Sequence, residues 1–139
     1  MSISSPVSGL TSVIITASIT NMNGFIIIGA MNGAFNSSVY TVPSATNIKQ
    51  GIFSSNVSLL SVQMIHSTQN YNMTFQFTGL TANTIYSFFY FCTVEDPSIT
   101  SLSSAVNVVS AQTLQMLIID INWGGFMSVA LVLFIMLVL

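Results

Sequence analysis

Residues 72–94 read NMTFQFTGLTANTIYSFFYFCTV, and this stretch decides the fold. Its first seven residues alternate strictly between polar and apolar side chains, the period of a strand with one buried face. Residues 85–94 are apolar on both faces, with Tyr86, Phe88, Tyr90 and Cys92 on one side and Phe89 and Phe91 on the other. A strand of this kind is covered by protein on both sides or borders an interface.

Shorter strands are predicted on either side of this stretch. Residues 12–20 alternate, with Val13, Ile15, Ala17 and Ile19 on one face. Three further strands are predicted, at residues 25–28, 57–66 and 105–109. The strand at 25–28 is apolar on both faces, which favours a central position in a sheet. Residues 43–51 predict a short helix capped by Ser44 and ended by Gly51. We therefore predict an all-β, antiparallel sandwich whose core contains Phe75, Leu80, Tyr86, Phe88 and Tyr90.

The segment Gly79-Leu-Thr-Ala-Asn-Thr-Ile-Tyr86 resembles the E–F corner of fibronectin type III-like domains. The resemblance implies that Leu80 plugs the core and that Tyr86 turns its hydroxyl back onto the backbone of the corner, as in a tyrosine corner. Ala82 and Asn83 replace the usual Pro and Gly, a mild departure because Asn tolerates a left-handed backbone. The segment 43–51 resembles a fibronectin-like repeat of large extracellular proteins of bacteria and protists. The resemblance spans 13–113 and specifies no ligand.

Charge is scarce along the whole chain of 139 residues. Charged residues make up only 3% of it, with one Lys or Arg and three Asp or Glu, whereas hydrophobic residues make up 52%. One cation cannot neutralise a phosphate backbone, so nucleic acid is excluded as a partner. Ser, Thr and Asn (21, 13 and 11 residues) supply most of the polar surface. Because charges are too few to cover the protein surface, hydroxyls and amides, glycans, other protein or lipid must cover it.

Residues that could carry chemistry are few, and we expect no catalytic, cofactor or metal site. His66 and Cys92 are the single residues of their types, too few for a zinc site, and Cys92 is expected to be a buried small hydrophobe. Glu95 and Asp96 could contribute to a calcium loop but more simply form a solvated turn. The chain contains three N-x-S/T sequons, as many as chance predicts, whose acceptors are Asn36, Asn56 and Asn72. If the domain is extracellular, these are candidate N-glycosylation sites.

The C-terminal run FMSVALVLFIMLVL (126–139) has no charge. We interpret 123–139 as an apolar helix with Trp123 as its membrane-interface anchor. It would be a transmembrane helix or part of a GPI-attachment signal, and the alternative is a buried core helix or strand. The N-terminus lacks a secretory signal, so we expect the chain to continue from a longer precursor. The expected layout is an N-terminal segment, a sandwich, a juxtamembrane linker and the tail, at 1–11, 12–113, 114–122 and 123–139.

These features predict a non-enzymatic, membrane-anchored surface glycoprotein domain with a structural or adhesive role in a cell coat or extracellular fibre. Its expected partners are the membrane and other surface proteins or copies of itself. A second hypothesis is a small accessory subunit of a membrane complex, with the tail packed against other helices. A third is a carbohydrate-binding module of a larger secreted protein, which would present an exposed Trp or Tyr on a sheet face.

Overall fold

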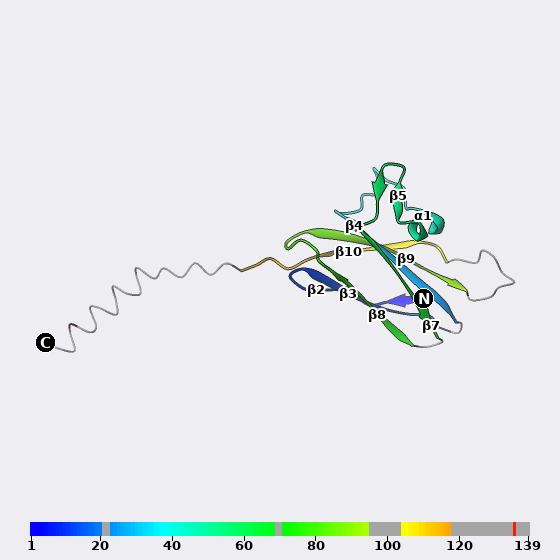
Figure 1. The fold of residues 1–139 in the computed structure, drawn as a ribbon, viewed down its shortest axis with the longest axis horizontal. Helices are drawn as coiled ribbons and strands as arrows, with labels where there is room; N and C mark the ends of the chain where they lie inside the picture. Colours follow the sequence, from blue (N-terminus) through cyan, green and yellow to red (C-terminus); the bar gives the residue numbers. More distant parts are fainter. Residues whose placement is uncertain (21–22, 69–70, 95–103, 118–134, 136–139) are drawn as a thin grey trace.

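A computed structural model describes residues 1–20, 23–68, 71–94, 104–117 and 135, and in these ranges the chain is built mainly from antiparallel β-strands (Figure 1). In the first sheet β3 is central: β8 pairs with it along one side, and the short strands β1 and β2 pair with the other. The strands of this sheet are β1 (Ser2–Ile3), β2 (Val7–Ser8), β3 (Ser12–Ser18) and β8 (Asn72–Thr78).

The second sheet has the order β10-β9-β4-β7, so β9 and β4 are its inner strands. Each of these two strands is hydrogen-bonded on both sides, as expected from their apolar sequences. A hairpin and a helix lie between β4 and β7 in the sequence. The elements are β4 (Gly24–Asn32), α1 (Ala45–Lys49), β5 (Ile52–Ser54), β6 (Val57–Ser58), β7 (Ser61–Ser67), β9 (Ile85–Val94) and β10 (Asn107–Gln112).

One hydrophobic cluster contains side chains from both four-stranded sheets. The alternating residues of β3 all enter it, and Phe77 of the first sheet lies 5.0 Å from Phe88 of the second, between ring centroids. Phe75, Tyr86 and Phe88 are buried there, while Leu80 and Tyr90 pack against it half-buried. The predicted common core is therefore confirmed for all five of the residues assigned to it.

A second cluster covers the opposite face of β9 and β4. Phe89 and Phe91 contribute from β9, and α1 and the β5–β6 hairpin cover them with Ile48 and Phe53. The Lys49 ammonium lies 5.9 Å from the centroid of the Phe91 ring, within cation–π range. Strand β9 is thus covered by protein on both faces, the first of the two possibilities that its sequence left open.

Helix α1 begins and ends where its sequence predicts. The Ser44 hydroxyl accepts a hydrogen bond from the Asn47 backbone N–H at 3.2 Å, which makes Ser44 the N-cap. Gly51 follows the last turn with φ of 72°, a left-handed conformation that glycine adopts without strain. The helix buries Ile48 against the outer face of the second sheet.

Three details of the strand prediction were wrong. The expected strand at 57–66 is divided: Val57 and Ser58 close the hairpin, and β7 begins only at Ser61. The expected strand at 105–109 runs instead from Asn107 to Gln112, because it pairs with the first half of β9. Strands β1 and β2 were not expected, since two residues each are too few to show a period.

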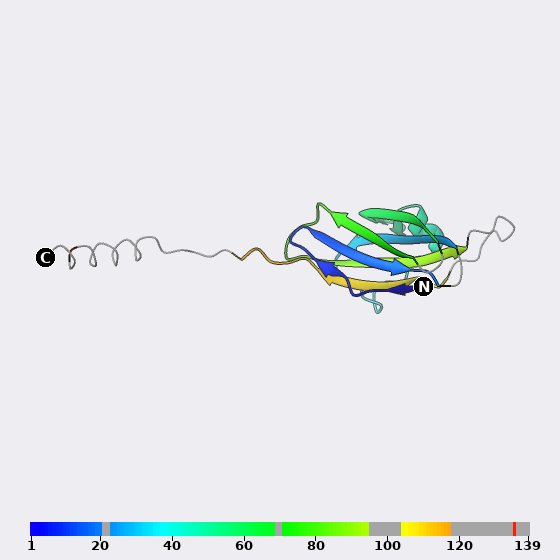
Figure 2. The same ribbon diagram turned by 90° about the horizontal axis from the view of Figure 1, so that it is seen from below.

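The predicted apolar helix at 123–139 lies outside the described residues, apart from Ile135, and so does its anchor Trp123. Among the helices of the described part of the chain, none is long and apolar enough to span a membrane. The chain reaches residue 117 after leaving the body beside β2 and β3 (Figure 2).

Gly29 in β4 lies close against the side chains of Leu59 and Ile48, which cover this face of the second sheet. A Cβ atom added there would lie 2.7 Å from Leu59 Cδ1 and 3.1 Å from Ile48 Cγ2. We predict that Gly29→Ala lowers the free energy of unfolding by about 1–3 kcal/mol, because it overpacks a close contact. Urea denaturation measures this. In a Leu59→Ala background the cost of Gly29→Ala should fall; an unchanged cost would contradict the assigned contact.

Candidate functional site

The corner, residues 79–86, connects the first sheet to the second. Tyr86 is 3% exposed, and its hydroxyl accepts a hydrogen bond from the backbone N–H of Thr81 at 2.9 Å. Asn83 takes a left-handed conformation, with φ of 51°, which Asn adopts more readily than most residues. Leu80 packs half-buried against the shared core. The corner is therefore held by a side chain that starts in β9 and returns to the turn.

Thr113 provides a second hydrogen-bonded anchor for the corner. It is 2% exposed, and its hydroxyl donates to the carbonyl oxygen of Thr81 at 2.6 Å and accepts from the backbone N–H of Thr84 at 2.9 Å. Thr81 is thus bonded at both its backbone groups, by Tyr86 and by Thr113. This arrangement fixes the segment after β10 against the corner.

Both ends of the described body are also joined to this region by backbone hydrogen bonds. The N–H of Leu114 donates to the carbonyl of Gly9 at 2.9 Å, and the N–H of Asn83 donates to the carbonyl of Leu114 at 3.1 Å. The N–H of Leu80 donates to the carbonyl of Thr11 at 3.0 Å. The corner, the start of β3 and the exit of the chain therefore form one connected unit.

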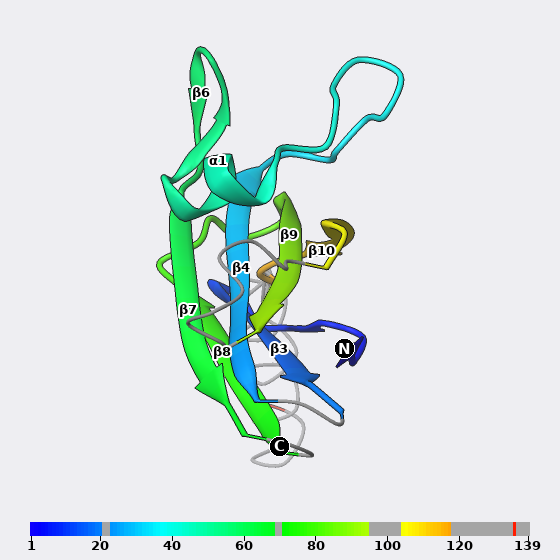
Figure 3. The same ribbon diagram turned by 90° about the vertical axis from the view of Figure 1, so that its right-hand side faces the viewer.

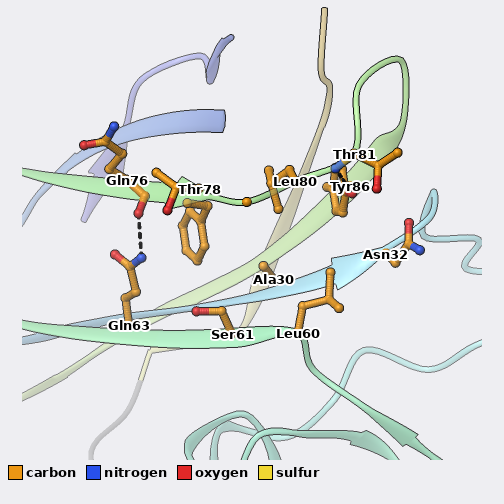
Figure 4. Close-up of a pocket in the computed structure, with 12 residues that line it drawn as sticks. Ala30, Asn32, Leu60, Ser61, Gln63, Gln76, Thr78, Leu80, Thr81 and Tyr86 are labelled. Atoms are coloured by element: carbon orange, nitrogen blue, oxygen red, sulfur yellow. Dashed lines mark hydrogen bonds between the residues drawn. The ribbon is translucent and has the colours of Figure 1, made fainter. Parts of the chain in front are cut away.

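A pocket of about 370 Å³ opens beside the corner, between β7 and β4 of one sheet and β8 of the other (Figure 4). Its volume is in the range of small-ligand sites. The lining consists of amides, hydroxyls and apolar groups from Ala30, Asn32, Leu60, Ser61, Gln63, Gln76, Phe77, Thr78, Gly79, Leu80, Thr81 and Tyr86. None of these residues is charged, so the pocket can hydrogen-bond a neutral polar group but cannot balance an ion.

Gln63 connects the two sheets at this pocket. Its side-chain Nε2 donates to the backbone carbonyl of Gln76 at 2.8 Å, across the gap between β7 and β8 (Figure 4). The carbonyl of Gln76 is therefore directed away from β3, toward the side of the molecule where β7 lies. The two sheets are linked along this side by a side chain instead of a backbone ladder.

The three sequon asparagines are all exposed. Asn36 lies in the loop after β4, and its Oδ1 accepts from the backbone N–H of Ser38 at 2.9 Å. Asn56 lies at the turn of the β5–β6 hairpin. Figure 3 shows this loop, in cyan, and the hairpin, in green, projecting in the same general direction. Asn72 begins β8, on the polar outer face of the first sheet.

Of the other residues singled out in the sequence, the structure describes only His66 and Cys92. His66 is exposed on β7 with its ring 5.1 Å from that of Phe25, and Cys92 is buried on β9. Glu95, Asp96 and Trp123 lie outside the described residues. Within the described ranges, no group of three or more His, Cys, Asp or Glu side chains is placed to hold a metal ion.

Sequence reasoning missed three buried residues with hydroxyl groups, Ser67, Ser87 and Thr113. Besides Thr113, Ser87 is fully buried: its hydroxyl donates to the carbonyl of Gly33 and accepts from the N–H of Phe35, both at 2.8 Å. Ser87 thus fixes the base of the loop that carries Asn36. A Ser in the midst of the aromatic run 85–94 was the one available signal, whereas nothing distinguishes Thr113 among so many threonines.

Comparison with known proteins adds no family to this geometry. No protein-family model matches the chain, and no curated protein sequence matches it at a significant level. The candidate sites therefore depend on the described contacts alone.

We predict that Thr113→Val lowers the free energy of unfolding by about 1–3 kcal/mol and Tyr86→Phe by about 1 kcal/mol, because each leaves backbone groups of the corner without their partner. Thermal or urea denaturation measures both. Thr78→Val, at an exposed position, is the control and should change little.

Because both side chains hold the peptide groups of Thr81, the double variant should depart from additivity. Strictly additive losses would show that the two anchors act independently and would contradict the connected corner.

Proposed function

We propose that the chain is a non-enzymatic, membrane-anchored domain of a surface glycoprotein, with a structural or adhesive role in a cell coat or extracellular fibre. The observation that carries the proposal is the position of the three sequons, with Asn36 and Asn56 exposed on two projections. An N-glycan needs an accessible asparagine, and each of the three meets that condition.

The proposed fold is a fibronectin type III-like sandwich. Two four-stranded antiparallel sheets that contribute side chains to one hydrophobic cluster support it. The hydrogen bond from the Tyr86 hydroxyl to the corner backbone supports it further, because a tyrosine corner has this geometry. The fold itself implies no activity, so the functional proposal depends on the surface.

The surface chemistry supports contact with neutral neighbours. Lys49 is the one charged side chain within the described ranges, and the pocket beside the corner is lined by amides, hydroxyls and apolar groups. A free domain is normally kept soluble by many mixed charges. Glycans, or the surfaces of other neutral proteins, would cover this polar but uncharged exterior.

Anchoring would come from the proposed tail at 123–139, through lipid. The linker leaves the body at the corner, where the peptide groups of Leu114 are bonded to Gly9 and Asn83. The accessory-subunit alternative uses the same tail but packs it against other helices, and the two differ in whether oligomers need lipid.

Glycosylation is tested on the protein from its native source. We expect intact mass to show an N-glycan on at least one of Asn36, Asn56 and Asn72, with the mass falling after glycan-releasing enzyme treatment. The corresponding Asn→Gln variant should lose that increment. Asn107→Gln, exposed but outside any sequon, is the matched control and should change nothing. An unmodified chain from the native source would refute the glycoprotein proposal.

The tail is tested by truncation. A chain ending at Met116 keeps both hydrogen bonds of Leu114, so we expect it to be folded and soluble without detergent. The full chain should partition into detergent micelles or vesicles, because the uncharged apolar run 126–139 has a favourable free energy of transfer from water into lipid. Flotation with liposomes measures this. A full chain that stays monomeric and soluble in plain buffer would contradict both the membrane anchor and the accessory-subunit alternative.

A further inference from the structure

The pocket beside the corner is hollow because two small side chains meet at its floor. Ala30 of β4 pairs with Ser61 of β7, and paired residues of an antiparallel sheet share one face. Ala30 belongs to the cluster between the two sheets, so this pair faces the first sheet. Further along β4 the same face carries the larger Ile26 and Ile28, which are fully buried. The space of about 370 Å³ therefore opens where the side chains of the second sheet become small.

Polar side chains line this space on a face where a sandwich normally carries apolar ones. Alternate residues of a strand share a face, so Asn32 follows Ala30 on β4, and Gln63 follows Ser61 on β7. The Ser61 hydroxyl and the Asn32 side-chain amide make no hydrogen bond to another described residue. Both groups can donate as well as accept a hydrogen bond. They are therefore available to a polar ligand in the pocket.

Hydrogen bonds hold the pocket at both of its ends (Figure 4). At one end the Gln63 amide donates to the Gln76 carbonyl at 2.8 Å. At the other end the Tyr86 hydroxyl accepts from the Thr81 backbone N–H at 2.9 Å. Groups that are already fixed lose less conformational entropy when a ligand binds. The walls of the pocket are therefore formed in advance.

We propose that this pocket binds one residue of a neutral sugar. A sugar ring carries hydroxyl groups around its edge and C–H groups on its faces. The hydroxyls match the side chains of Asn32, Ser61 and Gln63, which can donate hydrogen bonds to them. The C–H faces match the apolar side chains of Leu60 and Leu80, and Leu60 is 57% exposed before a ligand covers it. The proposal names a ligand for the adhesive role and rests on that role for its biological setting.

Other classes of small ligand fit the same lining less well. A carboxylate or phosphate would need a cation, and the single Lys or Arg side chain, Lys49, lies over Phe91 on the other face of the second sheet. A nucleobase would need an aromatic face for stacking, but Phe77 and Tyr86 are only 2% and 3% exposed. A hydrocarbon chain would leave the amides and hydroxyls of the lining without partners.

The first test uses saturation-transfer difference NMR on the full chain, in micelles of a detergent that has no sugar headgroup. The neutral probes are glucose, galactose, mannose and N-acetylglucosamine. We expect at least one of them to receive saturation and to bind in a titration. The hexuronate of the same sugar should bind several-fold more weakly, because nothing in the pocket balances its carboxylate. Adenosine should bind more weakly as well.

The second test places the sugar in this pocket. Ser61→Leu fills the floor and should abolish binding, whereas Asn32→Ala removes one amide at an exposed position and should weaken binding several-fold. Thr74→Leu and Asn107→Ala are the matched controls, both at exposed strand positions outside the pocket, and should leave binding unchanged. Circular dichroism and thermal denaturation confirm that each variant is folded.

A methyl glycoside of the bound sugar distinguishes the end of a glycan from a free sugar. We expect the glycoside to bind as well as the free sugar, because the pocket is open on one side of the sandwich and a glycan can continue outward. Loss of binding on methylation would still support a neutral sugar as the ligand, but it would identify a free sugar and remove the link to adhesion.

The proposal is overturned if none of the four sugars receives saturation, if the hexuronate or adenosine binds as tightly, or if Ser61→Leu and Asn32→Ala both leave binding intact. These outcomes are independent of the glycan and flotation results. A chain that binds a sugar but carries no glycan would refute the surface-glycoprotein proposal alone. A glycosylated chain that binds none of the sugars would refute the ligand alone.

Discussion

The burial of β9 on both faces is the constraint on which the rest of the structure depends. One face, with Tyr86 and Phe88, requires a second sheet, and the other, with Phe89 and Phe91, requires a separate cover. Burying each such ring is worth about 1.5–3 kcal/mol, so neither face can be left to water. The helix α1 and the β5–β6 hairpin, inserted between β4 and β7, supply that cover. A chain with few charges thus conceals its aromatic residues by adding a third layer.

The corner links the packing of the core to the hydrogen bonds that hold the turn between β8 and β9. The Tyr86 ring is buried in the core, and its hydroxyl accepts a hydrogen bond from the turn. The position of β9 in the core and the shape of the corner therefore depend on the same side chain. Thr113 then transfers the same restraint to the segment after β10. Because the pocket shares Tyr86 and Thr81 with the corner, its shape depends on these contacts too. The open side of the molecule, along β7 and β8, is left with the single bridge from Gln63.

Much of the fold could be predicted from local patterns, because alternation and capping are local effects. Residues 72–78 and 85–94 are strands at the expected bounds, and Ser44 caps α1. The hairpin was missed because residues 57–62, which read VSLLSV, contain no Gly, Pro or Asn to mark where one strand ends and the next begins. The hydroxyl of Thr113 was missed for another reason: its partners are 29 and 32 residues distant, and such pairing leaves no local pattern.

The joint between Leu114 and Gly9 has a mechanical consequence. If the chain after Leu114 is held in a membrane, a force on the body acts first on this joint, which lies next to the corner and the start of β3. The hydrogen bonds of Thr113 share that load with the core side chain of Tyr86 through Thr81. The tether would therefore pull on the hydrogen-bonded corner, and the load would reach the pocket through Thr81 and Tyr86, which line it.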